Sequence, residues 1–510
     1  MNCFAKLQVK AIVLRPSQQL ARIMKNFRPD IQALRAVAVL VVILYHLFPS
    51  KISGGFIGVD VFFVISGFLI TGHIAKELYA GQFSLTDFWV RRIRRLLPAA
   101  FLVIGTSFVA IYIWAELSVK ESWYRQLIAS TFYYQNWELA RTAVDYSAQN
   151  LHPSPVQHFW SLSVEEQFYI AWPILIVIAM AFAGTLSKIS IRQRLLLLLV
   201  LIWAVSLSYS IYFTAKDPTV AYFSTFTRAW EFASGALIAL LAEKIEAPKR
   251  IRFLVASFCL ISIILVSLLL PSSVAFPSYT ALLAVLPAGL ILLANVNSCF
   301  LGEVFNWTPI QKIGDASYSI YLWHWPLIAM WPLATTRELS SVDKIIIFFM
   351  SIFLALFTRK YVELPFINRK FRIARLKRPT FITAGVASSL ILVLASLSAS
   401  HAATSLNAEL SQVAKFTDAK VGHCFGATAR KQDRTLCENE KLGTRIIPNP
   451  AVALQDNSRI KFPKCPISTR ADSRAKFCLI GKPNSKFKVL LVGDSHADQF
   501  KGPVGKIAIK

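Results

Sequence analysis

Apolar blocks long enough to cross a lipid bilayer recur along the first 400 residues of this chain. A membrane-spanning helix needs ~20 mainly apolar residues, and only a helix satisfies its own backbone there. The chain is 55% apolar and 16% charged, less charge than a soluble chain carries. We therefore predict an all-α polytopic membrane bundle of about ten helices plus one linking helix. The predicted spans are 31–48, 58–76, 98–115, 158–184, 195–214, 224–242, 253–270, 276–294, 313–332, 343–358 and 380–399.

The net charge of +27 is distributed unevenly between the loops. If the N-terminus is cytoplasmic, Lys and Arg concentrate in the cytoplasmic loops, as the positive-inside rule requires. The basic runs 91–95 and 369–378 then face the cytoplasm, where anionic lipid headgroups explain them better than nucleic acid does. Residues 1–27 are predicted to be a cytoplasmic tail because they lack a signal-peptide pattern. Because eleven spans that begin with a cytoplasmic N-terminus end on the opposite side, the C-terminal segment is predicted to lie outside a bacterial inner membrane.

The chain divides into a membrane domain (28–366), a basic loop with a linking helix (367–400), and an extracytoplasmic segment (401–486). Four cysteines of the last segment form two pairs with equal spacing. We favour the disulfides Cys424–Cys437 and Cys465–Cys478, since the compartment is oxidising. A zinc site is the alternative, although no C-x-x-C spacing supports it.

A strand is predicted at 487–492, followed directly by Gly493-Asp494-Ser495-His496. An α/β domain needs on the order of 100 residues, and few remain after this strand. We therefore interpret 487–510 as the start of an incomplete α/β domain and expect the sequence to be a fragment or a truncated product.

Ionisable side chains within membrane helices indicate function by default. Arg35 and His46 are eleven residues apart in the first span, which places them on one helix face ~16 Å apart. Further polar residues from four other spans are expected at the level of His46, where a neutral imidazole beside a carboxylate is a plausible general base. These residues are Asp60, Glu165, Glu166, Arg228, Glu231 and His324.

The arginines of the predicted cytoplasmic face suit a phosphate-rich ligand. Arg35 lies near this surface, and Arg92 and Arg95 belong to the dense run 91–95. Guanidinium groups bind phosphate in a bidentate manner and keep their charge. We therefore expect a donor held by its phosphates on the inside, with a reacting end that extends outward.

Several sequence motifs resemble those of the membrane-bound acyltransferase family 3. They include 28–36, the Arg35-x10-His46 pair, Arg92-x-x-Arg95 and the stretches 58–69, 159–169, 317–326 and 361–365. The match covers roughly residues 28–366, in the family's order. The last helix leading to Gly493-Asp494-Ser495-His496 resembles the subset fused to an SGNH-type hydrolase domain, as in O-antigen acetylases.

This resemblance implies an acyltransferase with an acyl-CoA donor, usually acetyl-CoA, and no bound cofactor. It implies O-acetylation of a cell-surface polysaccharide, lipopolysaccharide or peptidoglycan. It also implies importance for Arg35, His46, Arg92 and Arg95. We expect the three arginines to hold the donor and His46 to be the base, with Glu165 or Glu166 either orienting His46 or contacting the acceptor. Ser495 matches the nucleophile of the SGNH domain, whose partner residues are absent. No metal and no nucleic acid are expected.

Two other functions are consistent with the same features. A glycolipid transporter or flippase also needs intramembrane charges, although we detect no inverted repeat. An external esterase anchored in the membrane would need only one helix, and this one lacks most of its hydrolase domain.

Overall fold

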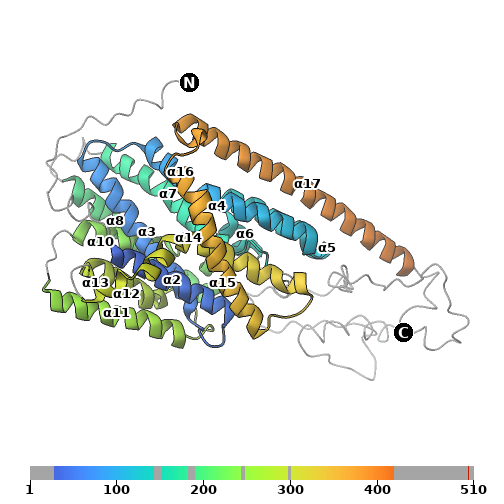
Figure 1. Cartoon of the computed structure of the whole chain (residues 1–510), viewed down its shortest axis with the longest axis horizontal. Helices are drawn as coiled ribbons and strands as arrows, with labels where there is room; N and C mark the ends of the chain where they lie inside the picture. The colour runs from blue at the N-terminus through green and yellow to red at the C-terminus, as the bar shows by residue number, and fades with distance from the viewer. Residues whose placement is uncertain are drawn as a thin grey trace, which may run out of the picture. The chain divides into compact units, whose positions relative to one another are not determined.

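The computed structural model describes residues 28–142, 152–181, 190–242, 247–296 and 300–417, together with residue 504. These residues form helices and connecting turns, with no strand among them (Figure 1). The α-helices are α2 Pro29–Leu47, α3 Gly58–Tyr79, α4 Leu85–Trp114, α5 Leu117–Thr131, α6 Gln135–Thr142, α7 Phe159–Ala181, α8 Ile191–Lys216, α9 Pro218–Phe223, α10 Ala229–Leu241, α11 Lys249–Leu269, α12 Leu282–Ala294, α13 Phe300–Phe305, α14 Thr308–Thr335, α15 Ser341–Thr358, α16 Leu364–Ile367 and α17 Lys377–Thr417.

Eight helices within the described residues are long and apolar enough to span a membrane: α2, α3, α4, α7, α8, α11, α15 and α17. The other three predicted spans fall on α10 and α12, which are shorter, and on α14, which is long but rich in polar and aromatic residues. The prediction of a polytopic helical bundle is therefore confirmed. The protein is a multi-pass membrane protein.

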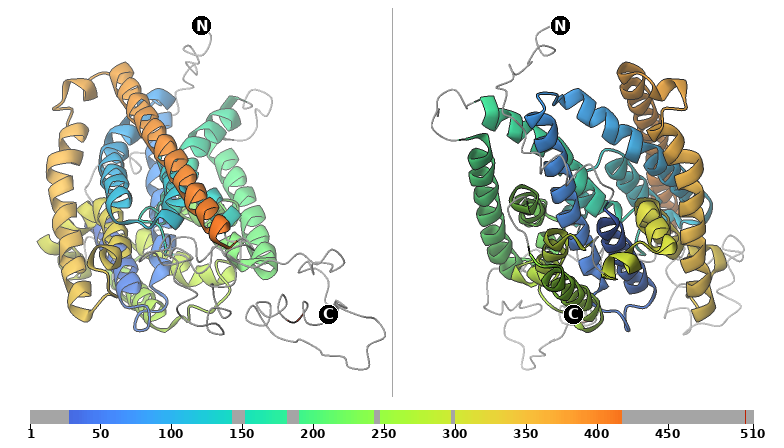
Figure 2. Two further views of the ribbon diagram at one scale, coloured as in Figure 1. Left: turned by 90° about the vertical axis from the view of Figure 1, so that its right-hand side faces the viewer. Right: turned by 60° about the vertical axis from the view of Figure 1, so that its left-hand side comes forward.

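Helix α2 lies inside the bundle, where it packs against α14 and α3 (Figure 2, right). The two helices α2 and α14 run parallel, because contacts link their beginnings and their later turns in the same order. Gln311 near the start of α14 donates to the carbonyl of Pro29 at 2.9 Å, and His324 meets His46 further along. Gly314 allows the backbones to approach, since a Cβ atom there would overlap the carbonyl of Gln32.

A second close approach joins α3 to α10. A Cβ atom on Gly67 would overlap the carbonyl of Phe232, and one on Gly235 would overlap that of Val64. Small residues at such crossings let membrane helices pack tightly. The two contacts fix α3 between α10 and α2, which positions the polar side chains of α3 in the interior.

Two of the predicted boundaries were wrong. Helix α4 begins at Leu85, with Ser84 accepting from the backbone of Asp87 at 3.4 Å, so the arginines 91–95 lie within the helix instead of in a loop. Helix α17 continues to Thr417, well past the predicted end of the linking helix at 399. In both cases the helix continues through turns made of polar residues, and a hydropathy pattern does not assign these residues to the helix.

The predictions for 1–27 and for 418 onward, except residue 504, lie outside the described residues. They include the two disulfides, Cys424–Cys437 and Cys465–Cys478, and the Ser495 motif. Cys259 is a buried free thiol on α11, as its apolar neighbours predict.

Candidate functional site

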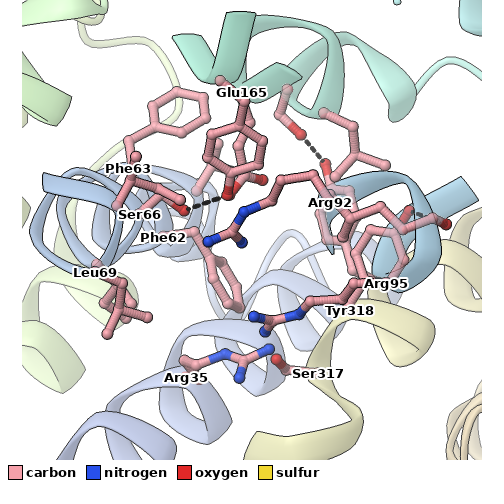
Figure 3. Close-up of a pocket in the computed structure, with 18 residues that line it drawn as sticks. Arg35, Phe62, Phe63, Ser66, Leu69, Arg92, Arg95, Glu165, Ser317 and Tyr318 are labelled. Carbon is pink, nitrogen blue, oxygen red and sulfur yellow. Dashed lines mark hydrogen bonds between the residues drawn. The ribbon is translucent and has the colours of Figure 1, made fainter. Parts of the chain in front are cut away.

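A cavity lies between α2, α3, α4, α7 and α14, with about 730 Å³ of empty space including its opening. Figure 3 shows side chains from these helices directed into it. The lining combines charged and hydroxyl groups with apolar and aromatic walls. Its residues are Arg35, Val59, Phe62, Phe63, Ile65, Ser66, Leu69, Ile70, Arg92, Arg95, Leu96, Ser161, Leu162, Glu165, Tyr169, Ser317, Tyr318 and Tyr321.

Three guanidinium groups converge on this cavity: Arg35 from α2, and Arg92 and Arg95 from α4 (Figure 3). Arg35 is 8% exposed and donates to the side chain of Gln32 at 3.0 Å. Arg92 lies over the ring of Tyr169, 5.0 Å from its centroid. Glu165 is the single carboxylate among the lining residues, so the lining carries an excess of positive charge.

The other two arginines of the run 91–95 are held away from the cavity. Arg91 pairs with Glu77 at 2.9 Å, and Arg94 donates to the carbonyl of Leu376 at 3.2 Å. Positions 92 and 95 share one helix face by their spacing. The structure therefore separates a cavity-facing pair from a pair engaged with other elements.

Glu165 is bound within a small hydrogen-bond network in the cavity wall. The hydroxyls of Ser66 and Tyr169 both donate to its Oε1 atom, and the two hydroxyl oxygens are 3.2 Å apart. The next residue, Glu166, is half-buried and is not part of the cavity lining. The predicted pairing of either glutamate with His46 is not found among the described hydrogen bonds.

His46 instead contacts a second imidazole. Its Nδ1 atom lies 3.1 Å from Nε2 of His324, whose Nδ1 lies 2.6 Å from the carbonyl oxygen of Tyr321. A carbonyl only accepts, so Nδ1 of His324 carries the proton and its Nε2 is an acceptor. His46 then donates through Nδ1, and in the neutral ring its Nε2 keeps a lone pair. This hydrogen-bond chain gives His46 the tautomer of a base.

The cavity and the histidines are adjacent. Ser317, Tyr321 and His324 are at i, i+4 and i+7 on α14, which places them along one helix face. The hydroxyls of Tyr321 and Ser161, both in the cavity lining, are 2.6 Å apart. Tyr321 also donates to the carbonyl of His158 at 3.0 Å. Tyr321 therefore contacts both the cavity and the histidine group.

Asp60, Arg228 and Glu231 form a separate buried cluster. One nitrogen of Arg228 donates to Asp60 at 2.7 Å and to Glu231 at 3.1 Å, and all three side chains are at most 1% exposed. Trp160, Tyr222 and Phe276 surround the guanidinium. The i,i+3 spacing of Arg228 and Glu231 on one helix allows their pairing. The contact of Arg228 with Asp60 of α3 could not be predicted from the sequence, because it joins two different helices.

The structure thus brings together Arg35, Arg92, Arg95 and Glu165 at the cavity and His46 with His324 beside it. It also contains functional candidates that our sequence analysis did not select: Ser66, Tyr169, Ser317 and His158. Hydroxyl residues in apolar helices usually bond to their own backbone, so spacing alone could not distinguish these. No group of three or more His, Cys, Asp or Glu among the described residues is arranged to hold a metal ion.

The fold and the site define a multi-pass membrane protein with a basic internal cavity beside a histidine pair, of which His324 is buried and His46 half-buried. A family model described as an acyltransferase domain matches residues 28–360. The chain therefore belongs to the acyltransferase family 3, as its motifs predicted. The match includes all the site residues named above apart from Leu376, which lies beyond its end.

Similar proteins carry names consistent with this assignment. OatA of Listeria monocytogenes, named a peptidoglycan O-acetyltransferase, is 34% identical over 323 residues, which are 61% of this chain and 50% of OatA. YrhL of Bacillus subtilis, a candidate peptidoglycan O-acetyltransferase by name, is 36% identical over 322 residues, 60% of this chain and 49% of YrhL. A candidate O-acetyltransferase of Staphylococcus aureus strain MSSA476 is 31% identical over 392 residues, 72% and 62% of the two chains.

This chain spans about half the length of OatA and YrhL. No solved structure matches it. The names of the first two relatives refer to peptidoglycan, whereas the sequence resemblance favoured O-antigen and lipopolysaccharide. The SGNH-type domain and the lipopolysaccharide acceptor remain predictions.

Proposed function

We propose that this protein transfers an acetyl group from cytoplasmic acetyl-CoA to hydroxyl groups of a cell-envelope carbohydrate outside the inner membrane. The observation that carries the proposal is the convergence of Arg35, Arg92 and Arg95 on a cavity whose lining residue Tyr321 packs against His324 of the histidine pair. The acceptor favoured by the names of the relatives is peptidoglycan. Lipopolysaccharide is the second candidate, from the sequence resemblance.

The donor end of the proposal rests on the three guanidinium groups. Coenzyme A carries a diphosphate and a further phosphate, and Arg binds such groups through paired hydrogen bonds. Within a largely apolar cavity these charges are screened little by water. We expect the phosphates to lie near Arg35, Arg92 and Arg95, and the acyl thioester to extend toward Ser161 and Tyr321.

The proposed role of His46 as the base depends on its tautomer. Its Nε2 lone pair would accept the proton of the acceptor hydroxyl as that oxygen attacks the acyl carbon. Protonated His46 keeps its Nδ1 hydrogen bond to His324, and a bond from a charged donor is stronger than a neutral one. The proton would then pass to the departing thiolate, so that the products are the ester and the free thiol of coenzyme A.

The proposed orientation follows the distribution of charge. The parallel packing of α2 and α14 is consistent with both helices running outward, as the positive-inside rule requires if the N-terminus is cytoplasmic. The basic cavity end would then face the cytoplasm and the histidines the outer half. A donor confined to the cytoplasm and an external acceptor could meet within the bundle.

A thiol-release assay on the purified full chain tests the proposal. Acetyl-CoA is supplied with soluble peptidoglycan fragments, with lipopolysaccharide, or with neither. Thiol release that depends on a carbohydrate supports the proposal and identifies the acceptor class. A transporter or flippase would release no thiol under any of these conditions, and that result would overturn the proposal.

A further inference from the structure

His158 is the third imidazole of the histidine group and has no role in the mechanism above. It precedes α7 directly and is 3% exposed. Neither ring nitrogen has a hydrogen-bond partner. The backbone of Leu322 is close to the ring, but the geometry of a hydrogen bond is not met. A buried polar group without a partner is destabilising, so this position needs an explanation.

The ring of His158 packs against His324, which also contacts the proposed base His46. Its centroid is 5.6 Å from that of His324 on one side and 5.4 Å from that of Tyr321 on another. His46 lies on the same His324 ring, with centroids 5.2 Å apart. Hydroxyl groups from the cavity wall fix the backbone, because Tyr321 donates to the His158 carbonyl at 3.0 Å and Ser161 at 3.3 Å.

We propose that His158 is a further catalytic residue, whose ring N–H donates a hydrogen bond to the carbonyl oxygen of the acyl group during transfer. The inference rests on the proposed function. Two imidazoles flank His324: His46 has the tautomer of a base, and His158 has polar atoms without partners directly behind the cavity wall. For this hydrogen bond the acyl group must extend past Tyr321, which lines the cavity and packs against the His158 ring.

In the proposed step, His46 accepts the proton and His158 stabilises the oxyanion. The acceptor hydroxyl gives its proton to Nε2 of His46 while its oxygen bonds to the acyl carbon, and the electron pair of the C=O bond moves onto the carbonyl oxygen. The N–H of His158 stabilises this oxyanion. The oxyanion then collapses, the C–S bond breaks, and the proton on His46 passes to the thiolate.

The key variant is His158→Phe, which keeps a flat ring and removes both nitrogens. Losing one oxyanion donor lowers turnover by about 10²–10³-fold. We therefore expect kcat for acetyl transfer to fall by about 100-fold or more, with the KM for acetyl-CoA nearly unchanged. Because the variant removes an unpaired buried polar group, its thermal midpoint should be unchanged or higher. A merely structural histidine would give the opposite pattern, lower stability with kcat preserved in the folded fraction.

Two further variants complete the test. His158→Gln retains an N–H donor and should recover part of the lost turnover. His152→Gln changes an exposed histidine six positions earlier and should leave kcat unchanged. If the turnover of His158→Phe is within about threefold of that of the unmodified chain, the role of His158 is wrong and the proposed function is unaffected. An unmodified chain that releases no thiol from acetyl-CoA overturns the proposed function instead.

Discussion

The Nδ1 atom of His46 lies 3.1 Å from the Nε2 atom of His324. The carbonyl of Tyr321 fixes the tautomer of His324, and this in turn leaves a lone pair on Nε2 of His46. In the Ser-His-Asp triad the histidine base is oriented by a carboxylate. In this protein a second imidazole and a backbone carbonyl provide the same orientation without a buried negative charge.

Replacing His46 by Ala should remove acetyl transfer while the chain still inserts and folds. A general base contributes typically 10²–10⁴-fold to the rate. Replacing His324 by Phe should lower turnover less, because the base remains and only its tautomer is released. Turnover in detergent, normalised to the amount of folded protein, measures both. Equal turnover of His46→Ala and the unmodified chain would contradict the assignment.

The arginine run offers a test with matched controls. Arg92→Ala combined with Arg95→Ala should weaken acetyl-CoA binding by at least tenfold, because these side chains line the cavity. Arg91→Ala combined with Arg94→Ala removes the same charge from the same helix, but these residues bind Glu77 and Leu376. Titration with acetyl-CoA should show little change for the second pair. An equal loss in both double variants would indicate a general effect of charge on topology.

The buried cluster around Arg228 should matter for stability. Arg228→Met leaves Asp60 and Glu231 without their shared guanidinium, and breaking a buried ion pair typically costs about 3–5 kcal/mol. The control is Arg125→Met in the pair of Arg125 with Glu121, whose side chains are 58% and 32% exposed, since surface pairs contribute about 0–1 kcal/mol. Thermal unfolding of both variants in one detergent gives the comparison. A similar shift in both would contradict the interpretation.

Helix packing can be tested with two glycines. Gly67→Ala places a Cβ atom against the carbonyl of Phe232 and should destabilise the bundle by about 1–3 kcal/mol. Gly105→Ala meets nothing within 4 Å and should stabilise α4 by about 0.5–1 kcal/mol through its helix propensity. The thermal midpoints should therefore shift in opposite directions.

The sequence predicted the bundle well because hydropathy reports burial in lipid directly. Each predicted span falls on a helix, and Arg35 and His46 lie on one helix by spacing alone. The partners of these residues could not be predicted, because they come from other helices. Glu165 binds Ser66 and Tyr169, and His46 meets His324, 278 residues away. Helix crossings set these pairs, and the small residues that fix the crossings, such as Gly67, have no signature in hydropathy.

The most direct test of the central claim is acceptor-dependent release of the coenzyme A thiol by the purified full chain. The account predicts that acetyl-CoA alone gives little thiol and that soluble peptidoglycan fragments increase the rate. The same increase should be absent in His46→Ala and reduced in the Arg92 and Arg95 double variant. If the folded, unmodified chain releases no thiol with peptidoglycan fragments or with lipopolysaccharide, the proposed acetyl transfer is wrong.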